Sequence, residues 1–165
     1  MKGLQVLTSK NSDEWETPND VFNALDEHFN FTLDVAATKE NTKCKKYFTE
    51  KDDGISQNWG YNVCWMNPPY SNIKGWMRKA ETAYAAGATV VCLVPARTDT
   101  AWWHDYAMKA TERRFIRGRI AFLKNGVAKN KAPFPACYVI FDNRACTICG
   151  INIDEYDSCG CEWSQ

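Results

Sequence analysis

Residues 88–94 constrain the fold of this chain most, because every side chain in this run except Thr89 is apolar. A run of this length, rich in valine, predicts a strand buried on both faces, and such strands occur in sheets that helices cover on both sides. Residues 73–86, just before it, repeat apolar side chains at helical spacing and are followed by Gly87, which favours an amphipathic helix with a glycine cap. A helix beside a doubly covered strand indicates an α/β protein.

Helices and strands alternate along the rest of the chain. The sequence predicts helices at 18–29 and 100–110, strands at 31–35, 61–66, 114–123 and 136–141, and a brief strand at 47–49. Since the last two strands have no helix between them, we expect an antiparallel edge pair on a mostly parallel sheet. Only about 25 residues separate the first strand from the next strong one, too few for two full strand–helix units of roughly 30 residues each. The expected fold is a three-layer α/β sandwich with an abbreviated sheet.

Composition excludes several classes of protein. Lys plus Arg and Asp plus Glu each number 20, so no global positive field exists and any contact with nucleic acid needs a local basic patch. The apolar runs are far shorter than the roughly 20 residues that cross a bilayer, and the first residues lack a signal-peptide core. With 165 residues the chain is one domain's worth. We expect a cytoplasmic protein with no membrane contact; its oligomeric state is left open.

The strongest chemical signal lies where the strand at 61–66 ends, in Asn67-Pro68-Pro69-Tyr70. Each proline fixes its own φ and holds the preceding residue extended, so Asn67 and Pro68 are rigid. The side-chain oxygen of Asn67 and the carbonyl oxygen of Pro68 then form two adjacent acceptors for one amino group. Accepting both protons of an exocyclic amine would localise its lone pair for attack on an electrophilic methyl group, with Tyr70 stacked on the ring. The alternative is a plain Asn-Pro turn.

This tetrapeptide resembles the signature of S-adenosylmethionine-dependent enzymes that methylate adenine N6, cytosine N4 or a glutamine amide. Other segments occur around it in a compact order, at residues 13–18, 33–37, 53–54, 59, 71, 76, 93–100, 118–122 and 138–141. Together they resemble the phage-type DNA N6-adenine methyltransferase family over residues 13–142. The resemblance implies a Rossmann-like methyltransferase fold, S-adenosylmethionine as methyl donor, and a DNA adenine flipped out of the duplex. Cytosine N4 and glutamine amides remain the alternative substrates.

Candidate cofactor residues follow from the fold and the resemblance. Ligands of open α/β sheets bind beyond the carboxyl ends of the strands, and Asp34 would accept there from the amino group of the methionine part. The full candidate set is Trp15, Thr17, Pro18, Asp34, Ala36 and Asp53. The family implies the roles of Thr17-Pro18 beside the cofactor, and Asp53 would bind its ribose or adenine. The chain lacks the glycine-rich loop of many such enzymes, and the alternatives are helix caps, an Asp-Gly turn and a core tryptophan.

Basic residues gather between residues 113 and 131, in the last strand pair and its connecting loop. A basic edge beside the reactive loop, residues 67–70, would contact DNA phosphates. The candidates for DNA contact are Arg97, Arg117, Arg119, Lys124 and Lys129. A solvated run of charges is the alternative.

Cysteine spacing divides the chain into a methyltransferase domain, 1–142, and a cysteine-rich tail, 143–165. The tail contains Cys146-x-x-Cys149 and Cys159-x-Cys161, which predict a structural zinc site with four thiolates. The alternative is a short terminal strand with incidental cysteines. Earlier cysteines lie in apolar runs or stand alone and are expected to be reduced core residues, at positions 44, 64, 92 and 137. A non-catalytic nucleic-acid-binding module built around this tail is the rival to an enzyme.

Overall fold

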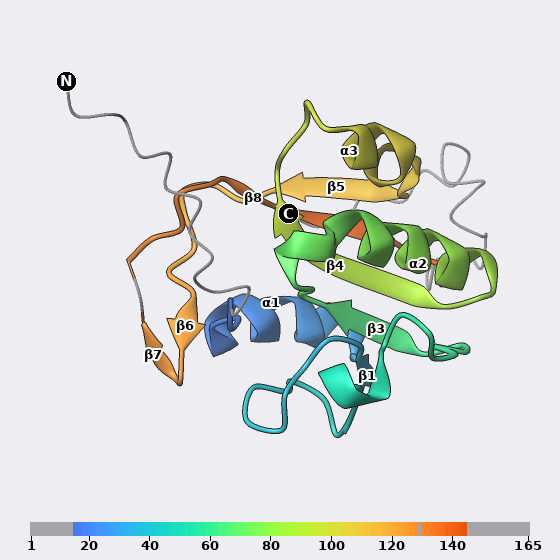
Figure 1. The fold of residues 1–165 in the computed structure, drawn as a ribbon, viewed down its shortest axis with the longest axis horizontal. Coiled ribbons are helices and arrows are strands. Elements are labelled where there is room, and N and C mark those ends of the chain that lie inside the picture. Colours follow the sequence, from blue (N-terminus) through green and yellow to red (C-terminus); the bar gives the residue numbers. More distant parts are fainter. Residues whose placement is uncertain (1–14, 129, 145–165) are drawn as a thin grey trace.

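The computed structural model describes residues 15–128 and 130–144. Among these residues the helices are α1 (Asn19–Phe29), α2 (Ile73–Ala85) and α3 (Ala101–Asp105). The strands are β1 (Leu33–Asp34), β2 (Lys46–Tyr47), β3 (Val63–Met66), β4 (Thr89–Pro95), β5 (Glu112–Phe115), β6 (Leu123–Lys124), β7 (Val127–Ala128) and β8 (Ala136–Phe141). Short 3₁₀ turns occur at Glu50–Asp52, Tyr70–Asn72 and Ala107–Lys109. Figure 1 shows the helices packed along the sheet and the β6–β7 hairpin standing apart from it.

Six of the described strands form one sheet in the order β2-β1-β3-β4-β8-β5. The first four are mutually parallel, whereas β8 runs antiparallel to both β4 and β5. The chain pairs β1 with β2 on one side and then returns to pair β3 with β1 on the other. The strand order therefore reverses between β1 and β3, and such a switch point opens a crevice at the carboxyl ends of the two strands.

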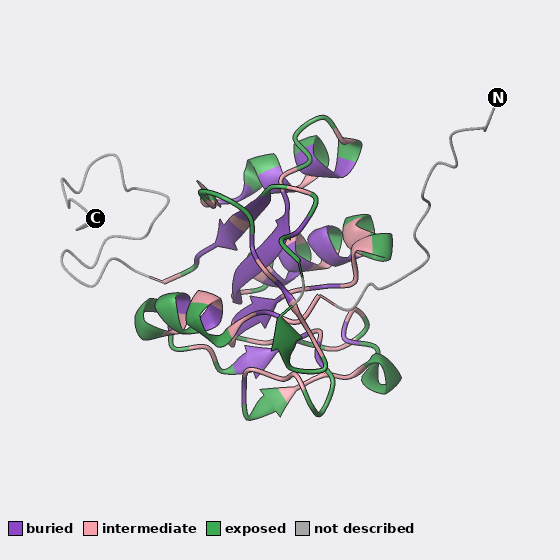
Figure 2. Cartoon of the chain, turned by 90° about the vertical axis from the view of Figure 1, so that its left-hand side faces the viewer, coloured by how far each residue is buried: buried purple, intermediate pink, exposed green. Residues whose placement is uncertain are grey.

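Side chains of the central strands alternate between two apolar clusters, as the pleat requires. Met66 of β3 packs on one face with Trp76 of α2. The neighbouring Trp65 points to the other face, where its ring meets Phe22 of α1 at a centroid distance of 5.3 Å. The sheet is thus covered on both sides, and Figure 2 shows its strands buried between helices whose outer faces are exposed. This confirms the three-layer α/β sandwich with a mostly parallel sheet.

The cysteines predicted for the core are buried and unpaired, at positions 44, 64, 92 and 137. Burial raises the pKa of the Cys64 thiol to about 12, so it stays protonated and behaves as a small apolar side chain. Among residues 15–128 and 130–144, no helix has the length and apolarity needed to cross a bilayer.

Two predicted elements were wrong. The strand expected at 114–123 is β5 alone, because the chain leaves the sheet after Ile116 and bends at Gly118, whose φ of +84° is left-handed. The helix expected at 100–110 is interrupted at Tyr106, where φ and ψ are −128° and −55°, so that α3 is followed by a separate 3₁₀ turn. Arg117 and Arg119 therefore lie in an exposed connection and not on a strand.

The central strand predicts a test of stability. Leu93 of β4 is fully buried, so Leu93→Ala should lower the free energy of unfolding by roughly 2 to 5 kcal/mol through lost burial and a residual cavity. Urea denaturation measures this change. The control is Val127→Ala, since the Val127 side chain is 68% exposed and its truncation should change stability little. Equal losses in both variants would contradict the assigned core.

Candidate active site

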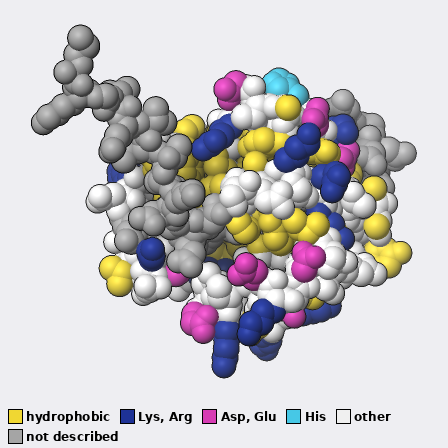
Figure 3. Space-filling view, viewed as in Figure 1, with side chains coloured by type: hydrophobic (Ala, Val, Ile, Leu, Met, Phe, Trp, Pro, Cys, Tyr) yellow, Lys and Arg dark blue, Asp and Glu magenta, His cyan; other side chains and the backbone are white. Residues whose placement is uncertain are grey.

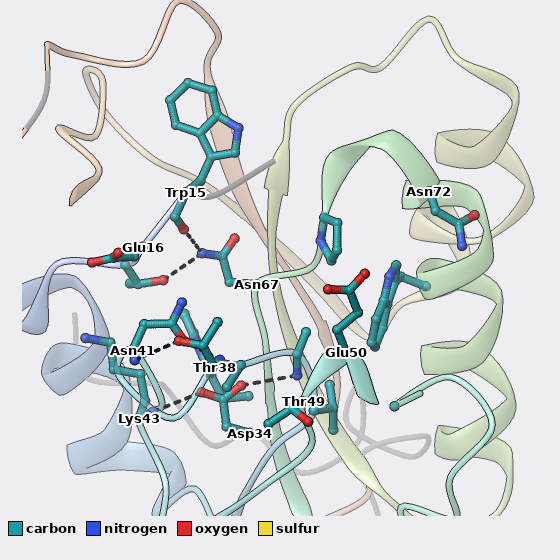
Figure 4. Close-up of a pocket in the computed structure, with 18 of the residues that line it drawn as sticks. Trp15, Glu16, Asp34, Thr38, Asn41, Lys43, Thr49, Glu50, Asn67 and Asn72 are labelled. Carbon is teal, nitrogen blue, oxygen red and sulfur yellow. Dashed lines mark hydrogen bonds between the residues drawn. The ribbon is translucent and has the colours of Figure 1, made fainter. Parts of the chain in front are cut away.

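A cavity of about 710 Å³ lies at the switch point, where β1 and β3 end. Most of its lining comes from residues 15–17 before α1, the turn after β1, the loop after β2, and the loop between β3 and α2, and Lys124 of β6 and Trp76 of α2 also contribute. Figure 4 shows side chains from these segments facing one another across the opening. Segments that are far apart in the sequence thus converge because the parallel strands β1 and β3 deliver their ends to the same edge.

The side-chain amide of Asn67 is held in one orientation. Its Nδ2 donates to the backbone carbonyl oxygen of Trp15 and, at 2.9 Å, to the hydroxyl oxygen of Thr17 (Figure 4). Both amide protons are thereby used, and Oδ1 is left as the acceptor, with the Tyr70 hydroxyl donating to it at 3.2 Å. Thr17 does not cap α1, because Pro18 precedes the helix and no side chain caps it. The segment before α1 therefore orients the asparagine of the reactive loop.

Aromatic rings surround the same loop. Trp15 stacks on Tyr70 at a centroid distance of 6.4 Å, and Phe134 meets both rings edge-on, at 5.3 Å from Trp15 and 5.6 Å from Tyr70. Burial raises the pKa of the Tyr70 hydroxyl well above its usual range, so this group stays a neutral hydrogen-bond donor. The loop thus places an amide oxygen of fixed orientation close to the flat apolar faces of these aromatic rings.

Asp34 ends β1 and is buried at the cavity wall. Its carboxylate accepts from the backbone N–H of Ala36 at 3.3 Å and of Lys43 at 2.9 Å. Desolvation nevertheless dominates and raises the pKa of Asp34 to about 6, against an ordinary value of 3.8. The side chain of Lys43 is half-buried beside it, and desolvation lowers the Lys43 pKa although Asp34 and Glu16 oppose this shift. One wall of the cavity therefore carries groups of both signs.

The loop after β2 packs close to the backbone that follows β1. Gly54 is buried, and a Cβ atom there would lie 2.2 Å from the carbonyl oxygen of Val35. This close approach explains why glycine follows Asp53. Asp53 itself adopts a left-handed φ of 51° and is exposed at the cavity, so it serves as a turn residue and as a lining residue at once. Trp76 of α2 both lines the cavity and packs in the core.

The structure brings together most of the predicted site residues. The cavity is lined by Trp15, Thr17, Asp34, Ala36, Asp53, Asn67 and Pro69. Pro68 is buried and Tyr70 is half-buried beside them, while Pro18 leads into α1. Among the predicted DNA-contacting residues Lys124 lines the cavity, whereas Arg97, Arg117 and Arg119 are exposed and do not. Lys129 and the tail cysteines, Cys146, Cys149, Cys159 and Cys161, lie outside the described residues.

Several lining residues were not predicted from the sequence, namely Glu16, Thr38, Asn41, Lys43, Thr49, Glu50 and Asn72. Most lie in loops after strand ends, where polar residues are ordinary and give no distinct signal. Lys43 is an example, because only the fold of the loop brings its backbone N–H to Asp34. Their common signal is position, since each lies after the carboxyl end of one of the parallel strands β1, β2 and β3 or just before α1.

The raised pKa of Asp34 has a consequence for stability. A carboxyl whose pKa is higher in the folded state stabilises fully below pH 3.8, and that contribution is lost as the pH rises through about 6. The difference corresponds to roughly 3 kcal/mol. Urea unfolding at pH 4, 6 and 7.5 should show this loss in the wild type, whereas Asp34→Asn should lack it. The same pH dependence in both proteins would exclude Asp34 as its source.

Comparison with known proteins identifies the family of this chain. The chain matches the family model of DNA N-6-adenine-methyltransferase (Dam) over residues 5–153, which extends beyond the resemblance at 13–142. It is 33% identical over 145 residues to the DNA N-6-adenine-methyltransferase of Haemophilus phage HP1 (strain HP1c1), with 83% of this chain and 84% of that relative aligned. It is 29% identical over 134 residues to the DNA N-6-adenine-methyltransferase of Escherichia phage T1, with 71% and 56% aligned.

These matches favour the enzyme over a non-catalytic nucleic-acid-binding module, and they confirm the resemblance carried by the reactive loop. Because the family model and the HP1 relative both align with most of the sequence, the chain belongs to the DNA N-6-adenine-methyltransferase family.

Proposed function

We propose that this chain transfers a methyl group from S-adenosylmethionine to N6 of an adenine in DNA, with the loop Asn67 to Tyr70 holding the flipped base. The single observation that carries this proposal is the fixed amide of Asn67. Its Nδ2 is occupied by Trp15 and Thr17, so Oδ1 is the atom left to accept from an incoming amino group. The Tyr70 hydroxyl that donates to it would be displaced by the substrate or share the acceptor.

The chemistry of the cavity suits S-adenosylmethionine. Asp34 and Lys43 both line the cavity and carry charges of opposite sign, the ammonium of Lys43 donating to Asn19 at 2.6 Å, and two such groups suit the zwitterionic amino-acid end of this molecule. The small side chains of Ala36 and Ala37 leave the backbone after β1 open to a ligand, and Asp53 lines the same space with oxygen acceptors for ribose or adenine. Bound there, S-adenosylmethionine would supply a methyl group already activated on a sulfonium.

Asn67 and Pro68 would act on the amine and not on the methyl group. Two oxygen acceptors hold both amine protons and keep the nitrogen lone pair directed at the incoming carbon. As the new N–C bond forms and the C–S bond breaks, positive charge grows on the amine, and both acceptors bind its protons more strongly. The sulfonium would leave as a neutral thioether, and the cationic amine would lose one proton to water, which gives neutral N6-methyladenine.

An adenine in a duplex cannot reach this loop, so the base must leave the stack or come from a single strand. Tyr70 would replace the lost stacking on one face, since aromatic rings hold bases through their π-faces. The neighbouring rings of Trp15 and Phe134 extend this apolar surface. Lys124, at the cavity, and the exposed Arg97, Arg117 and Arg119 supply cations for phosphates. Figure 3 shows Lys and Arg side chains scattered over one face among Asp and Glu side chains, so any phosphate contacts there would be separate and local.

Replacing the acceptor tests the proposal. Asn67→Ala removes Oδ1, so methyl transfer should fall by at least about 1000-fold while S-adenosylmethionine affinity stays within about threefold. The assay is transfer of labelled methyl to unmethylated DNA, followed by nucleoside analysis. The matched control is Asn58→Ala, an exposed asparagine that bonds only the backbone of Gly60 among the described residues and does not line the cavity.

The wild-type product discriminates among substrates. Label in N6-methyladenine supports the proposal. Label in N4-methylcytosine or in a protein glutamine would show that the same chemistry acts on a different amino group. Full activity of Asn67→Ala would refute the role of its side-chain oxygen.

The cationic residues make a separate prediction. If Lys124 and Arg119 contact phosphates, each alanine substitution should weaken DNA binding and reduce the slope of log K against log salt by about 0.9. Fluorescence anisotropy over a range of salt concentrations measures this slope. Lys109→Ala is the control, because Lys109 pairs with Glu81 in a surface salt bridge of 2.8 Å. An unchanged slope in the Lys124 and Arg119 variants would contradict their contact with DNA.

A further inference from the structure

Glu16 joins the β6–β7 hairpin to the segment that precedes α1. Its backbone forms a reciprocal bridge with Leu123, with N···O distances of 3.2 and 2.9 Å. Its carboxylate reaches the tip of the hairpin, where Oε1 accepts from the N–H of Asn125 at 2.8 Å and Oε2 from the N–H of Gly126 at 3.0 Å. A single residue therefore fixes both a strand and the turn of this hairpin.

The chain on either side of the hairpin is anchored in the core through the buried Phe122 and Ala132, whereas the hairpin's own strands have few contacts. Its strands hold two residues each and pair only with each other among the described strands. Both turn residues have positive φ, 52° at Asn125 and 73° at Gly126, which is the geometry of a tight two-residue hairpin turn. An isolated hairpin of this size is marginally stable at best. Phe122, whose ring meets Trp15 at 5.4 Å, holds the base of the hairpin, and the bonds to Glu16 clamp its turn.

The same segment orients the catalytic amide. Glu16 lies between Trp15 and Thr17, which supply the two acceptors for Nδ2 of Asn67. Figure 4 shows Glu16 beside Asn67 at the edge of the cavity. Lys124 of β6 lines that cavity too. Any movement of the hairpin relative to the core would therefore pull on the residues that set the direction of the Asn67 oxygen.

We propose that Glu16 is a positioning residue. It holds the β6–β7 hairpin and the Asn67 amide in a fixed position relative to each other, so that DNA bound at the hairpin presents its amine to Oδ1 of Asn67. This inference rests on the proposed function of Asn67 and Lys124. Glu16 acts through the Trp15–Thr17 segment and the hairpin backbone, and takes no part in the chemical step.

The test compares full-length wild type with Glu16→Ala and Glu16→Gln. Hydrogen exchange at Asn125 and Gly126 reports the clamp, and both variants should exchange faster. The single-turnover rate of methyl transfer, at saturating DNA and S-adenosylmethionine, should fall about 10- to 100-fold in Glu16→Ala, because a displacement near 1 Å has effects of this size. Glu16→Gln should lose less, since its amide oxygen still accepts one N–H. S-adenosylmethionine affinity should stay within about threefold in both.

Glu81→Ala is the matched control, because Glu81 is a carboxylate on α2 that pairs with Lys109 and does not line the cavity. It should leave both the exchange and the rate unchanged. Three results would overturn the inference. They are an unchanged rate with a released hairpin, hairpin amides that remain protected without the carboxylate, and a loss of cofactor affinity as large as the loss of rate. Absence of DNA methylation by the wild type would instead refute the proposed function, and hydrogen exchange would still test the clamp.

Discussion

The hydrogen bonds from Nδ2 of Asn67 to Trp15 and Thr17 join the loop after β3 to the segment before α1, and both segments line the candidate active site. Without them, the loop after β3 would carry its asparagine amide in either of two orientations, and the segment before α1 would keep only its bridge to Leu123, the bonds of Glu16 to the hairpin turn and the packing of Trp15. With them, one loop, one helix start and one cavity wall form a single unit. The direction in which Oδ1 points is set by where Nδ2 is bound, because an amide presents its donor and its acceptor on opposite sides.

Other residues of the cavity are kept at a cost in folding free energy. Asp34 is kept at a buried strand end although desolvation raises its pKa to about 6, and backbone N–H groups only partly offset that cost. Such costs are typical of residues placed for binding and not for stability. Gly54 shows the corresponding steric compromise, since any Cβ atom there would collide with the carbonyl oxygen of Val35, just after β1. The cavity is thus bounded by groups that the fold accommodates at some expense in free energy.

Much of this arrangement could be predicted from the sequence. The apolar run of β4, the helical period of α2 and the lack of a helix between the last sheet strands predicted a layered sheet with an antiparallel edge. The proline pair predicted a rigid loop at the end of β3. The prediction failed between residues 114 and 123, where alternating apolar and basic side chains suit a strand but Gly118 turns the chain out of the sheet. The pattern of apolar residues in a segment indicates which face of a sheet each side chain would prefer. Whether the segment joins the sheet depends on hydrogen bonds to a partner strand, which the local pattern does not reveal.

The sequence alone determined the reactive tetrapeptide, the family and the layered α/β fold, because these depend on local backbone restriction and on the period of apolar residues. Only the tertiary structure decided which polar residues share the cavity. Lys43 reaches Asp34 through a loop contact, and Glu16 reaches the hairpin tip across 109 and 110 positions of sequence. Such contacts follow from the order of the strands and from the reversal between β1 and β3. Their physical origin is the packing of the whole sheet, which no short stretch of sequence encodes.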